Sequence, residues 1–305
     1  MKKMMFNTID DVQSAMENAR YICDRALATS VYLGYVLGKP LLLEGEAGVG
    51  KTEVGKVIAE VLQTKLIRLQ CYEGLDVEHA LYEWDYPKQI LEIQLAKFQK
   101  EEGCNIDIER TIFSEKFLLK RPLLEAIQNH SEAPVVLLID EIDRADEAFE
   151  AFLLEVLSDF QISIPELGTI KAYQRPYVVI TSNQTRELHD ALKRRCLYHW
   201  IDYPCFEKEL RIVLTRVPSV QESLAQQVCT LMQRIRETDF LKKPGIAETL
   251  DWAEALVKLH KESIDEETLE ETLGCIFKYR EDIEKFREIE AEKKSIVPHG
   301  CRVCK

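Results

Sequence analysis

The chain has 305 residues, of which 46% are hydrophobic and 30% are charged, and its formal net charge is −13 at pH 7. This composition is typical of a globular protein with a large buried core, and the negative charge disfavours nucleic acid as a partner. No apolar run approaches the roughly 18 residues that a membrane span requires, and the basic start of the chain lacks the apolar segment of a signal peptide, so we expect a cytoplasmic protein.

The first predicted elements are a helical stretch over residues 9–37 and a short strand over Leu41–Glu44. The strand is an apolar run directly after Pro40, which bars a helix at that point. A second helix is predicted after Lys51, because the apolar residues that follow recur with the spacing of one helix face. These residues are Val54, Val57, Ile58, Val61 and Leu62.

Between this strand and this helix, residues 45–52 match the P-loop pattern G-x-x-x-x-G-K-[ST]. In such a loop the backbone N–H groups cradle phosphates, Lys51 reaches the β- and γ-phosphates, and the Thr52 hydroxyl ligates Mg²⁺. Strand, loop and helix is the order this chemistry requires, which disfavours the alternative of a glycine turn with a solvated lysine. The residues predicted to bind nucleotide are Gly45, Glu46, Ala47, Gly48, Val49, Gly50, Lys51, Thr52 and Glu53.

Four more strands are predicted from short, largely apolar runs, of which the run at 135–139 consists entirely of β-branched residues and leucine and the run at 198–201 is the weakest. They cover residues 66–70, 135–139, 177–181 and 198–201. Because helical stretches separate them, we predict an α/β fold with a parallel five-stranded sheet between helices. After Pro204 only helical patterns remain. The predicted domains are an α/β core over residues 1–205, a small all-helical domain over 206–296 and a disordered tail over 297–305.

Two segments of the chain are additional to what a minimal α/β fold of this kind needs. Residues 71–134 are far more than one crossover helix needs, and they include an aromatic and acidic tract over 72–86. This tract either contacts a partner beyond the nucleotide or packs the insertion against its own domain. The second segment is a predicted β-hairpin of residues 160–164 and 169–172, which alternate around a Pro/Gly turn.

The strand at 135–139 is followed directly by Asp140 and Glu141. Ligands bind at the carboxyl ends of parallel strands, so Asp140 is placed to hold Mg²⁺ and Glu141 to polarise an attacking water. The alternative is an acidic N-terminus of the next helix. The P-loop favours the catalytic interpretation, because phosphoryl transfer needs a metal and neighbouring carboxylates.

Two further polar positions follow. Asn183 comes just after the strand at 177–181 and can sense the γ-phosphate or orient the water, although it can also be a turn residue. Arg194 and Arg195 precede the last strand. Either they are surface charges, or one of them reaches into the nucleotide site of a neighbouring subunit as an arginine finger.

Together the P-loop, Asp140-Glu141, Asn183 and the arginine pair resemble, in order and spacing, an AAA+ ATPase with its helical lid. The sequence Asp140-Glu141-Ile142-Asp143-Arg144-Ala145 and the two insertions resemble the MoxR family. Within it, the CoxD-like subgroup, found beside carbon monoxide dehydrogenase genes, is the most similar. The tracts that carry the subgroup resemblance are residues 41–52, 69–76, 80–84 and 194–200.

The resemblance implies that Lys51 and Thr52 form Walker A, that Asp140 and Glu141 form Walker B, and that Asn183 is sensor 1. Arg195 becomes the arginine finger, with Arg194 as the substitute. It also implies ATP and Mg²⁺ as cofactors and a ring-shaped homo-oligomer, usually a hexamer. Members act as chaperones, commonly with a von Willebrand A-domain protein, and assist metal-cofactor insertion or assembly of a metalloenzyme client.

The chain departs from the family at sensor 2. Members usually carry Pro-Arg at the start of a lid helix, whereas residues 244–248 read Pro-Gly-Ile-Ala-Glu. We therefore assign no sensor 2 residue, and a nucleotide-gated scaffold with negligible hydrolysis is an alternative function. A DNA-processing AAA+ ATPase is a third hypothesis, which the net charge of −13 disfavours.

The nine cysteines are scattered without a framework spacing, which is typical of reduced thiols. Only Cys301 and Cys304 are closely spaced. Such a pair is half of a zinc site, for which His299 would be a third ligand. The alternative is that these residues belong to a frayed terminus, and the sequence leaves both interpretations open.

Overall fold

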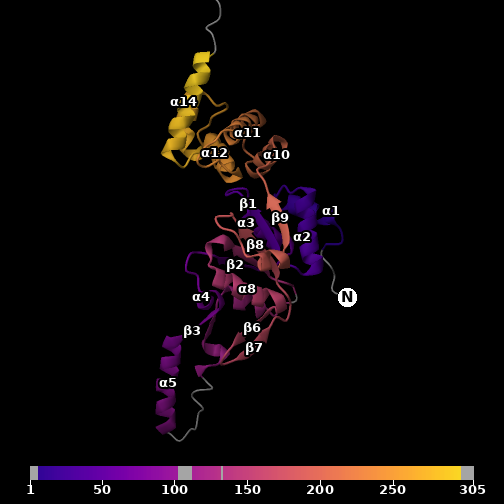
Figure 1. Cartoon of the computed structure of the whole chain (residues 1–305), viewed down its shortest axis with the longest axis vertical. Coiled ribbons are helices and arrows are strands. Elements are labelled where there is room, and N and C mark those ends of the chain that lie inside the picture. Colours follow the sequence, from indigo (N-terminus) through magenta and orange to yellow (C-terminus); the bar gives the residue numbers. More distant parts are fainter. Residues whose placement is uncertain (1–5, 102–111, 132, 297–305) are drawn as a thin grey trace, which may run out of the picture. The chain divides into compact units, whose positions relative to one another are not determined.

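The computed structural model describes residues 6–101, 112–131 and 133–296. Contacts divide the chain into two compact units (Figure 1). The first consists of Met1–Gly45 and Lys51–Ile201, and the second of Glu46–Gly50 and Asp202–Lys305. The predicted tail over 297–305, with its cysteine pair and His299, lies outside the described residues.

The first unit contains the predicted parallel sheet, in the strand order β2-β5-β8-β1-β9. Its strands are β1 (Leu41–Gly45), β2 (Leu66–Gln70), β5 (Val136–Asp140), β8 (Tyr177–Ser182) and β9 (Leu197–Ile201). Every residue of β1, β5 and β8 is buried. This explains their continuous apolar runs, because helices cover both faces of a parallel sheet. The predicted α/β fold class is confirmed.

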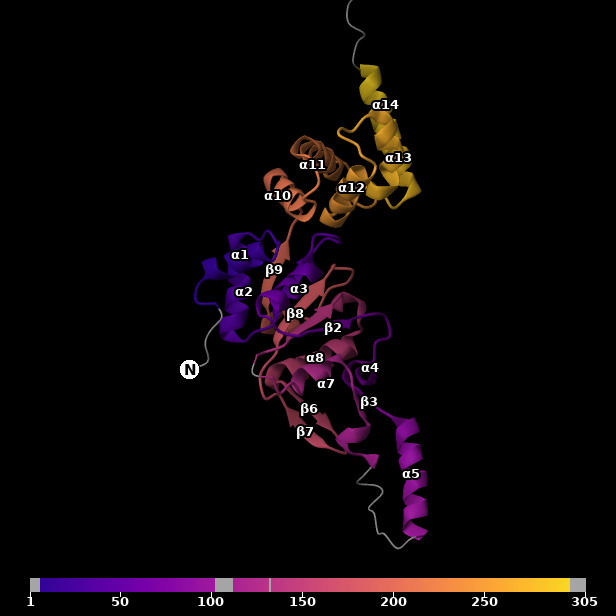
Figure 2. The ribbon, with the colours of Figure 1, turned by 180° about the vertical axis from the view of Figure 1, so that it is seen from behind.

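The helices around this sheet come mostly from the segments between its strands, as Figure 2 shows from behind. They are α1 (Ile9–Asn18), α2 (Arg25–Leu37), α3 (Lys51–Val61), α7 (Pro122–Ile127), α8 (Glu147–Asp159) and α9 (Asp190–Arg195). A short 3₁₀ helix, η2 (Ile142–Arg144), follows β5. Helix α3 packs against β1, β2, β5 and β8, which places the residues after the P-loop on the centre of the sheet.

The prediction of continuous helix over residues 9–37 was wrong at residues 19–24. Helix α1 ends at Asn18, and Arg20 has a left-handed backbone with φ 59°. Asp24 then begins a new helix, because its carboxylate accepts a hydrogen bond from the N–H of Leu27 at 2.8 Å. A side chain that caps a new helix in this way competes with continuation of the preceding one.

Both insertions belong to the first unit. The longer one contains α4 (Val77–Leu81), β3 (Tyr82–Trp84), α5 (Tyr86–Glu101), η1 (Glu115–Phe117) and β4 (Leu118–Lys120). Strands β3 and β4 pair antiparallel, which the sequence did not predict. The predicted hairpin is present as β6 (Gln161–Ile164) and β7 (Gly168–Lys171).

The second unit is helical beyond residue 205 in the part that the structure describes. Its helices are α10 (Phe206–Arg216), α11 (Glu222–Glu237), α12 (Ile246–Lys258), α13 (Glu266–Ile276) and α14 (Arg280–Ile296). They enclose a core of their own around Trp252. Within this core Arg236 and Glu209 form a buried ion pair at 2.7 Å. Arg236 also donates to the carbonyl of Pro244 at 2.8 Å, which fixes the chain just before α12.

Candidate nucleotide-binding site

The P-loop runs from the end of β1 to the start of α3. Its glycines Gly45, Gly48 and Gly50 have φ values of 152°, 79° and 97°, which disfavour residues with a side chain. A Cβ atom on Gly45 would also lie 2.2 Å from the carbonyl oxygen of Ile201 on the neighbouring strand β9. The glycines that the sequence pattern singled out are therefore required by the backbone of this loop.

Lys51 and Thr52 form the first turn of α3. The Lys51 side chain is buried, and its Nζ donates to the Gly45 carbonyl at 2.8 Å, so the ammonium group lies over the loop that precedes it. The Thr52 hydroxyl donates to Oδ1 of Asp140 at 2.9 Å. The two residues predicted to hold Mg²⁺ thus lie in contact, although they are 88 positions apart in the sequence.

Asp140 is the last residue of β5 and is 1% exposed. Its Oδ1 also accepts from the hydroxyl of Thr181 on β8, at 2.5 Å. Its Oδ2 accepts from Nε of Arg68 on β2 at 3.0 Å and from Nη2 of the same guanidinium. Threonine and aspartate oxygens are hard ligands, and Mg²⁺ commonly takes only one or two protein ligands beside phosphate oxygens. The group around Asp140 therefore fits this ion.

Sequence reasoning missed Arg68 and Thr181. The only sequence signal for Arg68 was a charged residue inside an otherwise apolar strand segment, Leu66–Gln70. Its pairing with Asp140 follows from the register, in which Arg68 lies beside Leu138 and Gln70 beside Asp140. Register is decided by the tertiary structure, so the local sequence could not identify the partner.

Glu141 follows Asp140 with a left-handed backbone, φ 55° and ψ 51°. For a residue other than glycine this conformation costs on the order of 1 kcal/mol, and such strain clusters at functional sites. It is held in place by the hydroxyl of Thr181, which accepts from the Glu141 N–H at 2.9 Å. The Glu141 carboxylate is 32% exposed and pairs with Nε of Arg144 at 2.7 Å. It therefore remains accessible to water next to the buried Asp140.

The loop after β8 carries Asn183, and it is tied to Asp143. The Asp143 carboxylate accepts from the backbone N–H of Asn183 at 3.2 Å, and from both the N–H and the hydroxyl of Thr185 at 2.9 and 2.7 Å. Burial raises the pKa of Asp143, but these hydrogen bonds outweigh burial and bring the pKa below its ordinary value. Asp143 thus stays charged at neutral pH and fixes the backbone that presents Asn183.

A second buried carboxylate lies directly before the P-loop. Glu44, at the end of β1, is 2% exposed and accepts from the side-chain amide of Gln184 at 2.7 Å. Burial and the nearby charge of Glu44 raise the pKa of the Tyr198 hydroxyl on β9. Glu44 therefore connects the strand that carries the P-loop to the loop that carries Asn183. No pattern in the sequence predicted a role for Glu44.

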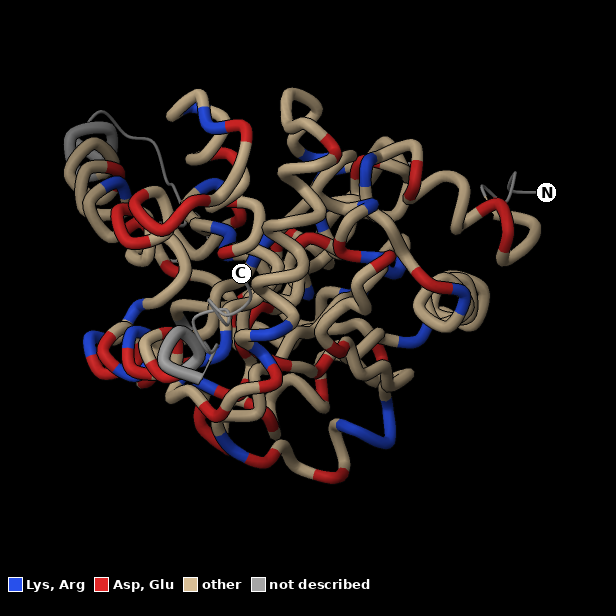
Figure 3. Tube along the Cα trace, turned by 90° about the horizontal axis from the view of Figure 1, so that it is seen from above, with Lys and Arg blue, Asp and Glu red and all other residues tan. Residues whose placement is uncertain are grey.

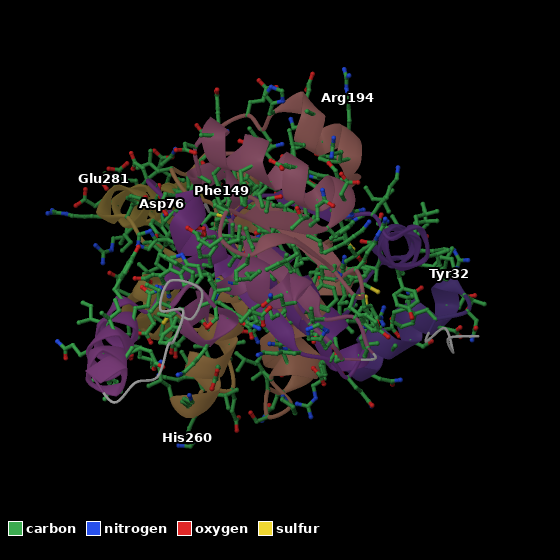
Figure 4. All side chains as sticks on the ribbon, turned by 90° about the horizontal axis from the view of Figure 1, so that it is seen from below. Tyr32, Asp76, Phe149, Arg194, His260 and Glu281 are labelled. Carbon is green, nitrogen blue, oxygen red and sulfur yellow. The ribbon has the colours of Figure 1, made fainter. Side chains whose placement is uncertain are left out.

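Arg194 and Arg195 end α9, and both are exposed. Nη1 of Arg195 donates to the carbonyl of Leu154 on α8 at 2.8 Å, within the same unit. Arg194 has no hydrogen-bond or ion-pair partner among the described residues, and its side chain points away from the ribbon (Figure 4). Of the two predicted fingers, Arg194 is the more available to another molecule.

Residues Glu46–Gly50 of the P-loop group with the second unit. The Gly48 carbonyl accepts from the N–H groups of Ile246 and Ala247 at 3.0 and 3.2 Å, in the first turn of α12. A Cβ atom on Gly245 would lie 2.8 Å from Gly48, so only glycine fits there. The acidic Glu248 occupies this turn, and its carboxylate accepts from the Gly245 N–H at 2.9 Å.

The remaining candidates concern cysteines and metals. The six cysteines that the structure describes are free thiols. Cys71, next to the site, has a pKa raised to about 12, chiefly by burial and then by the charges of Asp140 and Asp143. Within residues 6–101, 112–131 and 133–296, no group of three or more His, Cys, Asp or Glu side chains could hold a metal ion.

The family model of the AAA domain (dynein-related subfamily) matches residues 40–196, which is more than half of the chain. The chain belongs to this AAA family. The matched segment contains the P-loop, the Asp140-Glu141 pair, Asn183 and the arginine pair, so the AAA domain coincides with the site described above. The predicted membership of the AAA+ ATPases is confirmed at this level.

Solved structures with a similar fold include the Thermotoga maritima RuvB Holliday junction branch migration motor. It has a TM-score of 0.45 and 16% identity, with 88% of this chain and 72% of that chain covered. A mutant of the same protein has a TM-score of 0.48 and 17% identity over 89% and 73% of the two chains. No curated protein matches the AAA chain. None of the helices that the structure describes is long and apolar enough to cross a membrane.

Proposed function

We propose that this AAA protein is an ATP-hydrolysing chaperone of the MoxR type that remodels a client protein. The observation that carries the proposal is the arrangement around Asp140. This carboxylate accepts a hydrogen bond from the Thr52 hydroxyl at 2.9 Å, and the strained, accessible Glu141 follows it directly. Asp140 and Thr52 would hold Mg²⁺, which supplies positive charge to the phosphates when it is bound. The MoxR assignment rests on the sequence resemblance over residues 41–52, 69–76, 80–84 and 194–200.

The residues of this chain would then act as follows. The P-loop N–H groups and the Lys51 ammonium bind and orient the phosphates. The Glu141 carboxylate accepts a hydrogen bond from the attacking water, and Arg144, 2.7 Å from it, holds its orientation. The Asn183 amide, on the loop fixed by Asp143, orients the same water or contacts the terminal phosphate.

A neighbouring subunit would complete the site. We assign the arginine finger to Arg194 or Arg195, with Arg194 favoured because Arg195 already donates to Leu154. A finger in trans requires a homo-oligomer, for which the resemblance predicts a hexameric ring. We assign residues 1–205 to the nucleotide-binding core and 206–296 to the lid. A cytoplasmic location is part of the same proposal.

The suspected partners are a von Willebrand A-domain protein and a metalloenzyme client whose metal-cofactor insertion or assembly is assisted. We expect no nucleic-acid partner, in line with the net charge of −13. Figure 3 shows Lys and Arg interspersed with Asp and Glu along the trace. The absence of salt-sensitive DNA binding would exclude a DNA-processing function.

The test is the rate of Mg-ATP hydrolysis per chain as a function of protein concentration. A rate that rises and then saturates supports a site completed by a neighbour, and Arg194→Ala should lower it by about 10³-fold or more. Arg195→Ala is measured beside it, and the variant with the larger loss identifies the finger. Glu141→Gln should bind ATP but barely hydrolyse it, and ordinary turnover by this variant would refute the assignment.

A nucleotide-gated scaffold remains the second candidate. It is favoured by the start of α12, where residues 244–248 read Pro-Gly-Ile-Ala-Glu and lack the arginine that family members usually carry directly after the proline. In that case ATP would drive assembly while hydrolysis stayed negligible at every protein concentration. Substantial turnover by the purified chain alone would exclude it.

A further inference from the structure

A cavity of about 290 Å³ lies between the two insertions of the first unit. It is lined by His79, Tyr82, Glu83, Trp84, Tyr86 and Glu166. Five of these residues come from α4, β3 and the start of α5, and Glu166 comes from the turn between β6 and β7. Figures 1 and 2 both show β3 near this hairpin. We call this cavity the insertion pocket.

Aromatic rings form much of the pocket wall. Trp84 is 8% exposed, and its ring packs edge-on against Tyr82 at 6.0 Å and against Phe113 at 5.5 Å between centroids. Tyr86 is 60% exposed although it is aromatic. The pocket therefore combines a rigid, packed tryptophan with a tyrosine that a ligand can cover. Such rings attract cations through their π faces.

The charges in the pocket have the matching sign. Glu83 is paired with Arg121, and His79 with Asp76 at 2.7 Å. Glu166 is exposed and has no ion-pair partner among the described residues. The lining thus keeps one carboxylate without a counter-charge next to aromatic rings. A cationic group would satisfy both features, whereas an anion would meet only repulsion from Glu166.

The size and surroundings of the pocket restrict what carries this cation. At about 290 Å³ it lies at the lower limit for small-molecule pockets and suits a single long side chain. Beside it, α5 continues from Tyr86 with Ile90, Leu91 and Leu95, which are 57%, 56% and 50% exposed. Three apolar side chains this exposed within residues 90–95 of one helix indicate a contact surface. The ligand is therefore expected to be a polypeptide with apolar residues near its cationic side chain.

We propose that the insertion pocket binds an arginine side chain of a client or partner polypeptide, whose neighbouring apolar residues lie against α5. Arginine is favoured over lysine because its planar guanidinium stacks on aromatic rings and is less strongly hydrated. The biological role of this binding rests on the proposed remodelling function. Its chemistry is independent of the nucleotide site, so it can be tested without ATP hydrolysis.

The test uses the full chain without nucleotide and a fluorescent short peptide that has one central arginine flanked by leucines. A second peptide carries citrulline, which has nearly the same shape but no charge. Anisotropy should show saturable binding of the arginine peptide that is about tenfold tighter than that of the citrulline peptide. A ratio of this size is expected when a cation–π contact and an attraction to a carboxylate both contribute to the affinity. Equal affinity for the two peptides would overturn the proposal.

Substitutions at two exposed residues of the pocket locate the binding site. Tyr86→Ala and Glu166→Gln should each lower the affinity for the arginine peptide several-fold. The matched controls Tyr173→Ala, at a residue 77% exposed just after β7, and Glu60→Gln should leave this affinity unchanged. Unchanged affinity in both pocket variants would refute the assignment. A change in oligomeric state of Tyr86→Ala, without any peptide binding to the wild type, would also refute it, because the surface would then cover a second copy of the chain.

If Glu141→Gln binds the arginine peptide with the affinity of the wild type, the insertion-pocket proposal is supported even though hydrolysis is lost. Conversely, a chain that hydrolyses ATP but does not distinguish the two peptides refutes the insertion pocket and leaves the ATPase proposal intact. The two proposals therefore fail in different experiments.

Discussion

Replacing Arg68 with glutamine removes a guanidinium that contacts the buried carboxylate of Asp140. Oδ2 of Asp140 accepts two hydrogen bonds from this guanidinium, one at 3.0 Å. The carboxylate is 1% exposed and the Arg68 side chain 47% exposed. The variant therefore keeps a buried negative charge that has lost this ion pair and retains the hydrogen bonds from the hydroxyls of Thr52 and Thr181.

The magnitude follows from this geometry. Hydrogen bonds to charged groups contribute about 1.5–3 kcal/mol, and because Arg68 is half exposed, solvent screens part of the interaction. We expect Arg68→Gln to lower the free energy of unfolding by about 2 kcal/mol. For a unit of this size that corresponds to a melting temperature about 4–8 °C lower. Because Mg²⁺ would place another positive charge beside the same carboxylate, the deficit should narrow when Mg²⁺ and a non-hydrolysable ATP analogue are added.

The assay is thermal unfolding of the full chain with and without Mg²⁺ and the analogue. Lys65→Gln is the matched control, since it removes the same charge next to β2 but breaks only an exposed pair with Glu125. That control should change stability by less than about 1 kcal/mol. The reasoning is refuted if Arg68→Gln melts like the wild type, or if its deficit is the same with and without the metal and nucleotide.

Two further predictions concern buried charges. Burial raises the pKa of Asp143, but hydrogen bonds from Thr185 outweigh burial and bring the pKa below the ordinary value of an aspartate. The contribution of Asp143 to stability is present above that ordinary value and is lost as the pH falls through the lowered pKa. Asp143→Asn should therefore be less stable at neutral pH and lose less stability in acid, as measured by urea unfolding. Arg236→Met should cost about 3–5 kcal/mol, because Glu209 is 0% exposed and would remain unpaired. Calorimetry should show little change for the control Arg234→Met, whose ion pair is half exposed.

Much of the sheet could be predicted because its signals are local. The buried strands are continuous apolar runs, and the P-loop is a contiguous motif between a strand and a helix. The same local signals located Asp140 and Glu141, since they directly follow such a run. The break at residues 19–24 was missed because it depends on one capping contact of Asp24 rather than on the apolar pattern.

The sequence by itself determined the AAA fold class, the P-loop and the position of the acidic pair at a strand end, because each depends on residues that are neighbours in the chain. Only the tertiary structure decided that Arg68 and Thr181 share Asp140 and that Glu166 lies beside Trp84. Arg68 is 72 positions from Asp140 in the sequence, and Thr181 is 41 positions from it. Strand register and loop packing, which no local pattern encodes, bring them together.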